Sequence, residues 1–223
     1  MILYEYPQAS TFGRVVPKQK IYEHGSVSPK MRELFAAQVE QIRWQNKLAP
    51  ETINVKATQS VPEIQVFSVA LKGEEISPNA LKCIDDAIPL PLIFEIQKGN
   101  RLQIAAAPKV LTGGAVLCGE YYFSEWISAD SVRSPLPVAL DLSSLYGILL
   151  SSLVPYPMRS GEALAEWIVR LNLIQEKIRE AEKLEAKLRR EKQFNRQIPI
   201  NQELRKKKEE IKSLTFIKNE KTF

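Results

Sequence analysis

The chain has 223 residues, of which 44% are hydrophobic and 26% are charged, and this ordinary globular composition excludes disordered, collagen-like and membrane-spanning classes. With two cysteines, Cys83 and Cys118, and one histidine, His24, it also excludes disulfide frameworks, histidine-dependent triads and Cys- or His-rich metal sites. The sequence contains no Walker loop, dinucleotide-binding glycine motif or nucleophile elbow. We therefore expect no cofactor.

The net charge of +5 is unevenly distributed along the chain. Residues 160–223 contain 16 Lys/Arg and 11 Asp/Glu, which leaves 15 of each kind for residues 1–159. The excess positive charge therefore lies in the tail, where it would attract a polyanion or an acidic partner.

The N-terminal residues lack the basic segment and apolar core of a signal peptide. The most apolar stretch, residues 136–154, contains Asp141, four serines and flanking prolines, which favours a buried helix over a membrane span. We expect a cytoplasmic protein with reduced cysteines and no membrane partner.

In chain order, residues 12–20 carry Pro17 and are predicted to form an irregular arm. A helix is expected to begin at Ser28 and Pro29, because serine caps a helix and proline fits its first position, and to end at Pro50. Large apolar residues recur at helical spacing across this segment.

The middle of the chain alternates strand-like and helix-like segments. We predict strands at 63–71, 92–97, 101–107 and 117–127, a helix at 77–87 and turns at 98–100 and 113–114. These elements indicate an α+β fold, a small antiparallel sheet with packed helices, over residues 1–158.

The tail, residues 159–223, is predicted to be a basic helical domain. From Gly161 to about Lys192 a narrow apolar stripe recurs every three or four residues, and a break is expected at 198–201 before a second helix. Such a stripe is typical of a helical hairpin or a coiled coil, and it must be covered by the other helix, the sheet domain or a second chain. A homo-oligomer through the tail is one of these alternatives.

Acidic residues offer one candidate site. A metal-dependent nuclease of the Asp…Glu-x-Lys type needs its glutamate and lysine on one face of a strand, but Glu95 and Lys98 are three residues apart and face opposite sides. The candidates that remain are Asp86, Glu95 and Lys109, and no complete catalytic or metal site is predicted. The alternative interpretation is that these acids are strand-edge and helix-end charges.

Basic residues of the tail offer a second candidate site. Lys/Arg clusters of this kind bind phosphate backbones or acidic proteins. Interleaved glutamates are, however, also typical of a solvated helix with pairs of opposite charge. The candidate binding residues are Arg189, Arg190, Lys192, Arg196, Arg205, Lys206, Lys207 and Lys208.

Several blocks of the sequence, in the same order, resemble a bacterial and archaeal family catalogued as domain of unknown function 4391. The resemblance implies no established activity, but members of the family tend to be encoded near helicases and DNA methyltransferases of restriction-like defence systems. The blocks are FGRVVPKQKIYE (12–23), QVEQIRWQNKLAPETINV (38–55), EIQVFSVALK (63–72), CIDDAIPLPLIFEI (83–96), GEYYFSEWI (119–127) and EKQFNRQIPINQELRKKKEEIKSL (191–214).

Two functional hypotheses follow. The first is a non-catalytic accessory or adaptor subunit that docks on a helicase or methyltransferase, on nucleic acid, or on both, through its basic tail. The second is a diverged metal-dependent nuclease that uses Asp86, Glu95 and a cation. The lack of a complete catalytic constellation favours the first.

Overall fold

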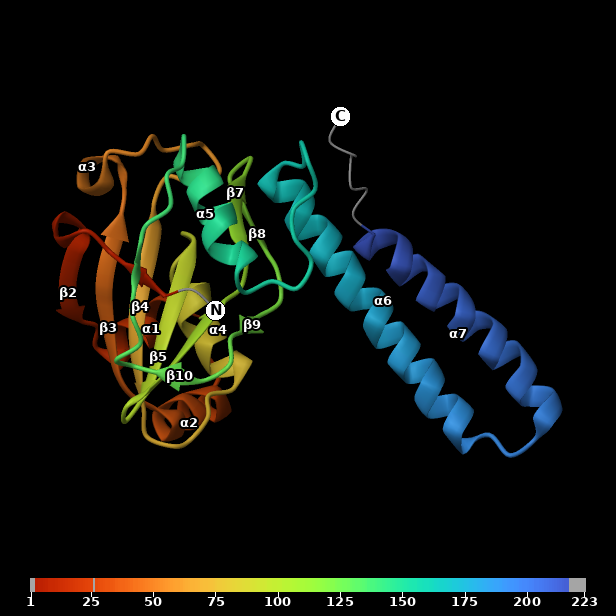
Figure 1. Ribbon diagram of the computed structural model, residues 1–223. Helices are drawn as coiled ribbons and strands as arrows, with labels where there is room; N and C mark the ends of the chain where they lie inside the picture. Colours follow the sequence, from red (N-terminus) through yellow and green to blue (C-terminus); the bar gives the residue numbers. More distant parts are fainter. Residues whose placement is uncertain (1–2, 26, 217–223) are drawn as a thin grey trace. The chain divides into compact units, whose positions relative to one another are not determined.

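The computed structural model describes residues 3–25 and 27–216 and divides into two units, Met1–Pro155 and Tyr156–Phe223 (Figure 1). Met1 and Ile2, part of the segment tested for a signal peptide, and residues 217–223 of the predicted tail lie outside the described residues.

The first unit is built on a seven-stranded sheet with strand order β10-β6-β5-β4-β3-β2, and β9 also pairs with β6. Two separate two-stranded sheets, β1–β11 and β7–β8, complete its described strands. The strands are β1 (Tyr4–Glu5), β2 (Thr11–Val15), β3 (Val39–Leu48), β4 (Ile64–Leu71), β5 (Leu92–Lys98), β6 (Arg101–Ala106), β7 (Lys109–Thr112), β8 (Ala115–Cys118), β9 (Tyr122–Phe123), β10 (Ile127–Ser128) and β11 (Ser134–Pro135).

The main sheet is mixed, so the expectation of a small antiparallel sheet is wrong. Strands β4 and β5 run parallel, whereas the other neighbours in the sheet are antiparallel. Parallel neighbours need a crossover, and α4 (Pro78–Ala87) provides it between these two strands. The strand–helix–strand order was visible in the sequence, but the direction of pairing was not deduced from it.

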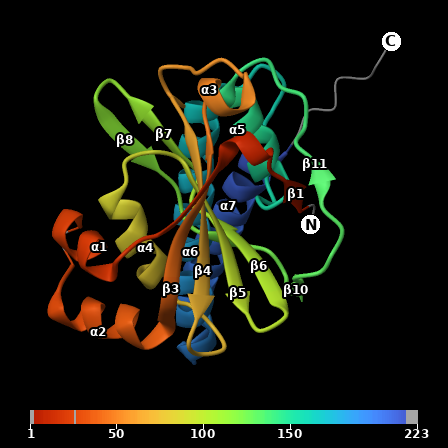
Figure 2. The ribbon, with the colours of Figure 1, turned by 90° about the vertical axis from the view of Figure 1, so that its left-hand side faces the viewer.

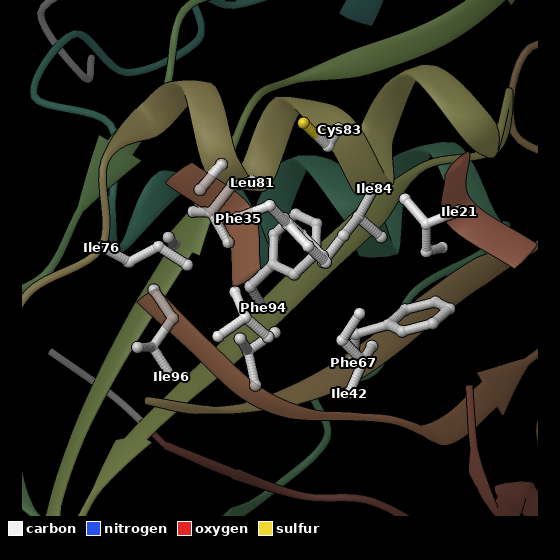
Figure 3. Close-up of a cluster of buried hydrophobic side chains, with 14 of the residues drawn as sticks. Ile21, Phe35, Ile42, Phe67, Ile76, Leu81, Cys83, Ile84, Phe94 and Ile96 are labelled. Atoms are coloured by element: carbon white, nitrogen blue, oxygen red, sulfur yellow. The ribbon is translucent and has the colours of Figure 1, made fainter. Parts of the chain in front are cut away.

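Three helices of the first unit cover one face of this sheet. Helices α1 (Lys18–His24), α2 (Pro29–Gln38) and α4 lie on the same side of β3, β4 and β5 (Figure 2). Their apolar side chains meet those of the strands in one buried cluster (Figure 3), which includes Ile21, Phe35, Phe67, Ile84 and Phe94. The unit also contains a 3₁₀ helix η1 (Gln8–Ser10) and helices α3 (Pro50–Ile53) and α5 (Leu142–Ser151).

Local sequence signals located several elements correctly. Strand 63–71, helix 77–87, strand 92–97 and the turn at 98–100 are confirmed as β4, α4, β5 and the β5–β6 turn. The Ser77 side chain caps α4 by accepting a hydrogen bond from the Ala80 N–H. Gly99 has φ +57°, the left-handed conformation that favours glycine in a tight turn. The buried helix expected within 136–154 is α5, and no helix among the described residues is long and apolar enough to cross a membrane.

The predicted helix from Ser28 to Pro50 is wrong in its second half. The chain forms α2 only to Gln38 and continues as β3, which pairs with β2 on one side and β4 on the other. Apolar spacing in this segment fits both structures, and pairing on both edges of β3 satisfies its backbone and decides the outcome. The predicted irregular arm at 12–20 instead forms part of β2 and α1.

The single strand expected at 117–127 is also wrong. This segment contains three short strands, of which β8 pairs with β7 and only β9 and β10 join the main sheet. Gly119 separates β8 from the aromatic residues that follow and donates its N–H to the Pro108 carbonyl.

The second unit is an antiparallel pair of helices, α6 (Leu164–Arg190) and α7 (Phe194–Thr215) (Figure 1). The two helices pack side by side within one chain. The buried residues include Leu171, Ile174 and Ala181 of α6 and Ile200 and Leu204 of α7. The predicted stripe is therefore partnered in cis by α7, as in a helical hairpin.

The break between the helices lies at residues 191–193, not at the predicted 198–201. Pro199 is inside α7, where it forfeits one backbone hydrogen bond near the helix start. The turn has its own hydrogen bonds, because the Gln193 N–H donates to Glu191 Oε1 at 2.8 Å and Gln197 Nε2 donates to the Glu191 carbonyl at 2.7 Å.

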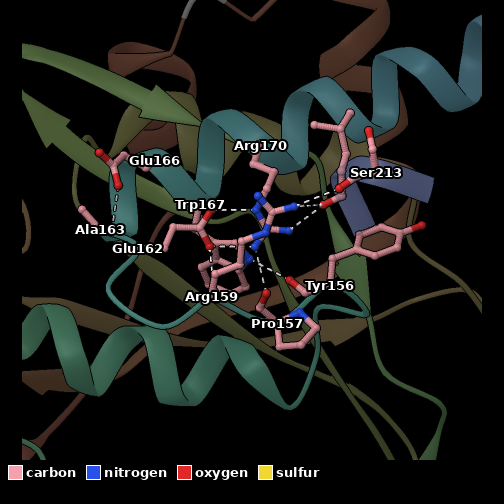
Figure 4. Close-up of polar contacts among 10 residues, drawn as sticks. Tyr156, Pro157, Arg159, Glu162, Ala163, Glu166, Trp167, Arg170 and Ser213 are labelled. Atoms are coloured by element: carbon pink, nitrogen blue, oxygen red, sulfur yellow. Dashed lines mark hydrogen bonds and ion pairs between the residues drawn. The ribbon is translucent and has the colours of Figure 1, made fainter. Parts of the chain in front are cut away.

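A buried arginine joins the open end of the hairpin (Figure 4). Arg170 of α6 donates from Nε and Nη2 to the two carboxylate oxygens of Glu162 at 2.6 and 2.7 Å. It also donates to the carbonyls of Pro157, at 2.8 Å, and Leu214 at the end of α7, at 3.2 Å. Arg159 adds hydrogen bonds to the carbonyls of Ser213 and Leu214. These two arginines satisfy C-terminal carbonyls of α7 that have no partner within the helix.

This network gives a pH prediction. Burial alone would raise the pKa of Glu162, but the hydrogen bonds from Arg170 and the Arg159 N–H lower it below its usual 4.5. A folded-state pKa below the unfolded value stabilises the hairpin above pH 4.5, and this stabilisation is lost as the pH falls through the lowered pKa. Glu162→Gln should therefore cost about 3–5 kcal/mol of unfolding free energy at neutral pH. The difference from the unmodified chain should shrink on acidification.

Denaturant unfolding followed by far-ultraviolet circular dichroism at a series of pH values measures this difference. Glu176→Gln, at an exposed position of α6, is the matched control and should change little. A destabilisation by Glu162→Gln that is the same in acid as at neutral pH would contradict the role of this carboxylate.

Candidate functional site

The three acidic and lysine candidates do not come together. Glu95 of β5 points to the face of the sheet opposite α4, since its neighbours Phe94 and Ile96 are in the cluster packed with α4. Asp86, at the end of α4, is exposed and pairs with Lys82 at 2.7 Å. Within the described part of the chain, no group of three or more His, Cys, Asp or Glu residues is arranged to hold a metal ion.

Lys109 forms a buried ion pair that has a structural role. Its ammonium group is buried, pairs with Asp85 Oδ1 at 2.5 Å and donates to the carbonyls of Asp85 and Ile88 at 3.1 and 2.7 Å. Tyr121 donates its hydroxyl to the other oxygen of Asp85. Burial raises the pKa of Asp85, and the contacts with Lys109 and Tyr121 oppose that rise. Lys109 therefore neutralises a buried acid and satisfies carbonyls at the end of α4.

Glu95 is bound by a residue that sequence reasoning missed. Arg133 donates from Nη1 and Nη2 to the two oxygens of Glu95 at 2.7 and 2.9 Å, and also from Nη1 to the Tyr4 carbonyl at 2.9 Å. This geometry is the bidentate pairing that arginine forms with carboxylates. Glu95 and Arg133 are 38 residues apart, so no local pattern predicts the pair.

The basic candidates of the tail gather at the closed end of the hairpin. We call residues 186–206, where α6 ends and α7 begins, the hairpin tip. It contains seven Lys/Arg and two Asp/Glu, a difference of +5, which equals the net charge of the whole chain. Six of the eight candidate binding residues lie there, together with Lys187 of the same basic cluster. The six are Arg189, Arg190, Lys192, Arg196, Arg205 and Lys206, all exposed and without an ion pair to any described residue.

The remaining two candidates are engaged between the helices. Lys207 pairs with Glu180 at 2.8 Å and with Glu210 at 3.2 Å, and Lys208 pairs with Glu185 at 2.7 Å. The hydrogen bonds that Lys207 donates to Glu180 and Glu210 raise its pKa. The predicted cationic run therefore has two parts, one that connects the helices and one that faces solvent.

The tip also exposes apolar surface. Phe194, the first residue of α7, is 73% exposed, and Ile198 one turn later is 43% exposed. With Leu188 and Arg205 they line a groove of about 380 Å³. An exposed aromatic ring among cations is a surface on which a base can stack. The aromatic residue was visible in the sequence, but its exposure depends on where α7 begins.

The start of α7 adds to the positive potential of the tip. No side chain of the residues that the structure describes caps this helix, and its first turn contains no acidic residue. The free N–H groups at the start of a helix carry a partial positive charge that favours anions. The first turn of α7 and the exposed Lys/Arg residues thus act in the same direction.

Two features thus define the class of this protein: a mixed α/β unit and a basic helical hairpin. The family described as Domain of unknown function (DUF4391) matches residues 5–211, nearly the whole chain, and the protein belongs to this family. No curated protein and no solved structure matches the chain.

The buried lysine gives a stability prediction. Lys109→Met should lower the unfolding free energy by about 3–5 kcal/mol, because it leaves Asp85 buried without its counter-charge. Lys82→Met is the matched control, since its pair with Asp86 lies on the surface and should contribute less than about 1 kcal/mol. Urea unfolding of both variants measures the two effects. Equal losses would show that Lys109 is not the required partner of Asp85.

Proposed function

We propose that this protein is a non-catalytic accessory subunit of a DNA-processing system, and that its hairpin tip binds the phosphate backbone of nucleic acid. The family resemblance implies a helicase or a DNA methyltransferase as the docking partner. The observation that carries the proposal is the set of exposed cations at the tip, which form no ion pair to any described residue.

The division of charges within the hairpin supports a polyanionic ligand. Glutamates of α6 neutralise Lys207 and Lys208 along the helix pair, whereas the exposed cations at the tip have no such partner within the described part of the chain. A surface on which several cations are unpaired within about 20 residues gains free energy from releasing the counterions of a phosphate backbone.

The exposed ring of Phe194 favours nucleic acid over an acidic protein segment. Base stacking on an aromatic side chain contributes about 1–3 kcal/mol per base and requires a single-stranded region. We therefore expect the tip to bind single strands, or duplexes with an unpaired end, more tightly than closed duplexes.

Nuclease chemistry is not part of the proposal. Asp86, Glu95 and Lys109 pair with Lys82, Arg133 and Asp85 respectively, so they do not form one site.

A salt titration tests the proposal. Binding of a fluorescent oligonucleotide to the whole chain should weaken linearly on a log–log plot against salt concentration. The triple substitution Arg189→Ala, Arg190→Ala and Arg196→Ala should reduce the slope by about 0.7 per lost phosphate contact on a single strand and about 0.9 on a duplex. Phe194→Ala should weaken single-strand binding without changing the slope.

The matched control removes charge from the same hairpin but from engaged residues. Lys207→Ala with Lys208→Ala should alter the slope much less than the triple substitution, because these lysines are already paired with glutamates and do not contact phosphates. No binding at low salt would refute the proposal and leave an acidic protein as the ligand of the tip. An equal loss in control and triple variant would place the interface elsewhere.

A further inference from the structure

The face of the main sheet opposite α4 is hollowed into a polar trough of about 530 Å³. Strands β3, β4 and β5 are neighbours in the main sheet (Figure 1). Their register aligns two rows of residues across the three strands. One row is Gln41, Ala70 and Gln97, and the other is Arg43, Ser68 and Glu95. Residues in register on neighbouring strands point to the same face, so these rows stand side by side.

The hollow has a simple steric cause. The central strand contributes the small side chains Ser68 and Ala70, whereas both flanking strands contribute long polar ones. The trough therefore follows β4, with its floor at Ser68 and Ala70 and its walls on β3 and β5. On the opposite face, β4 places the large side chains Phe67 and Val69 in the core.

The walls carry hydrogen-bonding groups that are free. The side-chain carboxamides of Gln41 and Gln97 lie on opposite sides of Ala70. Neither of them forms a hydrogen bond to any described residue. Arg43 uses Nη1 to donate to the Gly13 carbonyl at 2.8 Å, which fixes the guanidinium at the wall and leaves further N–H donors. Polar groups that line a concave site without partners are suited to bind a polar ligand.

The remaining charges at the trough are balanced. Glu95 and Arg133 neutralise each other through two hydrogen bonds. Burial and the negative charge of Glu95 raise the pKa of Tyr6, so this lining residue stays protonated at neutral pH. Apart from this pair, the lining contains one acid, Glu5, and one cation, Arg43, so the trough does not have the charge of a polyanion site or the carboxylate cluster of a metal site.

We propose that this trough binds an adenine nucleotide, with Gln41 and Gln97 at the base and Arg43 at the phosphate. A carboxamide matches the donor and acceptor at the N6/N7 edge of adenine, and a guanidinium matches a phosphate. The volume lies within the range of about 300–1,000 Å³ that holds ligands of this size. The trough belongs to the first unit and shares no residue with the hairpin tip, so this proposal does not depend on the proposed function.

Isothermal titration calorimetry of the whole chain with AMP tests the assignment, with GMP, CMP, UMP and inorganic phosphate as competing probes. AMP should bind most tightly. Gln41→Ala and Gln97→Ala should each weaken AMP binding by about tenfold, because each removes one contact to the base edge. Arg43→Ala should weaken AMP and inorganic phosphate alike.

A matched control is Gln8→Ala, an exposed glutamine of η1 that does not line the trough, and it should leave AMP binding unchanged. Circular dichroism establishes that each variant is folded, and the two glutamine variants decide the test if Arg43→Ala does not fold. Equal binding of the four nucleotides would overturn the base assignment. Absence of AMP binding, or AMP binding unaffected by both glutamine substitutions, would overturn the site.

Discussion

The organisation of the second unit depends on one buried arginine. Arg170 lies within the apolar stripe of α6, where a charge is costly unless it is paired and hydrogen-bonded. Glu162 and the carbonyls of Pro157 and Leu214 provide those partners, and the last of them lies at the end of α7. The arginine therefore requires the two helices to meet at their open end. With the helices antiparallel, the basic end of α6 and the start of α7 are adjacent at the tip.

In the first unit, too, a buried charge is costly unless it is paired and hydrogen-bonded. This requirement separates charges with a structural role from charges that are free to bind a ligand. Lys109 neutralises Asp85 in the interior, and Arg133 neutralises Glu95 at the sheet. These pairs account for Lys109 and Glu95, two of the three residues that the sequence offered as catalytic candidates. Among the described residues, the groups left without partners include exposed cations at the hairpin tip and side-chain carboxamides at the trough. We infer binding functions from these unpartnered groups, because a polar group gains most from a ligand when no protein group has already satisfied it.

The sequence correctly predicted those elements that local signals determine. The serine cap of α4, the apolar run of β4 and the glycine turn after β5 each act within a few residues, and those elements were located correctly. β3 was misassigned because its apolar spacing also fits a helix and only pairing with β2 and β4 distinguishes the two. The basic residues of the tip were identified, but the engagement of Lys207 with Glu180 was not. The trough was missed entirely, since it arises from the register of three strands.

The central claim is that the hairpin tip is the nucleic-acid-binding surface, and hydrogen exchange followed by mass spectrometry tests it most directly. The whole chain would be measured with and without a single-stranded oligonucleotide at low salt. The account predicts slower exchange in residues 186–206 and no change around Glu162 and Arg170 at the open end. Slower exchange confined to the first unit, or no slowing at the tip under conditions where the oligonucleotide is bound, would contradict it.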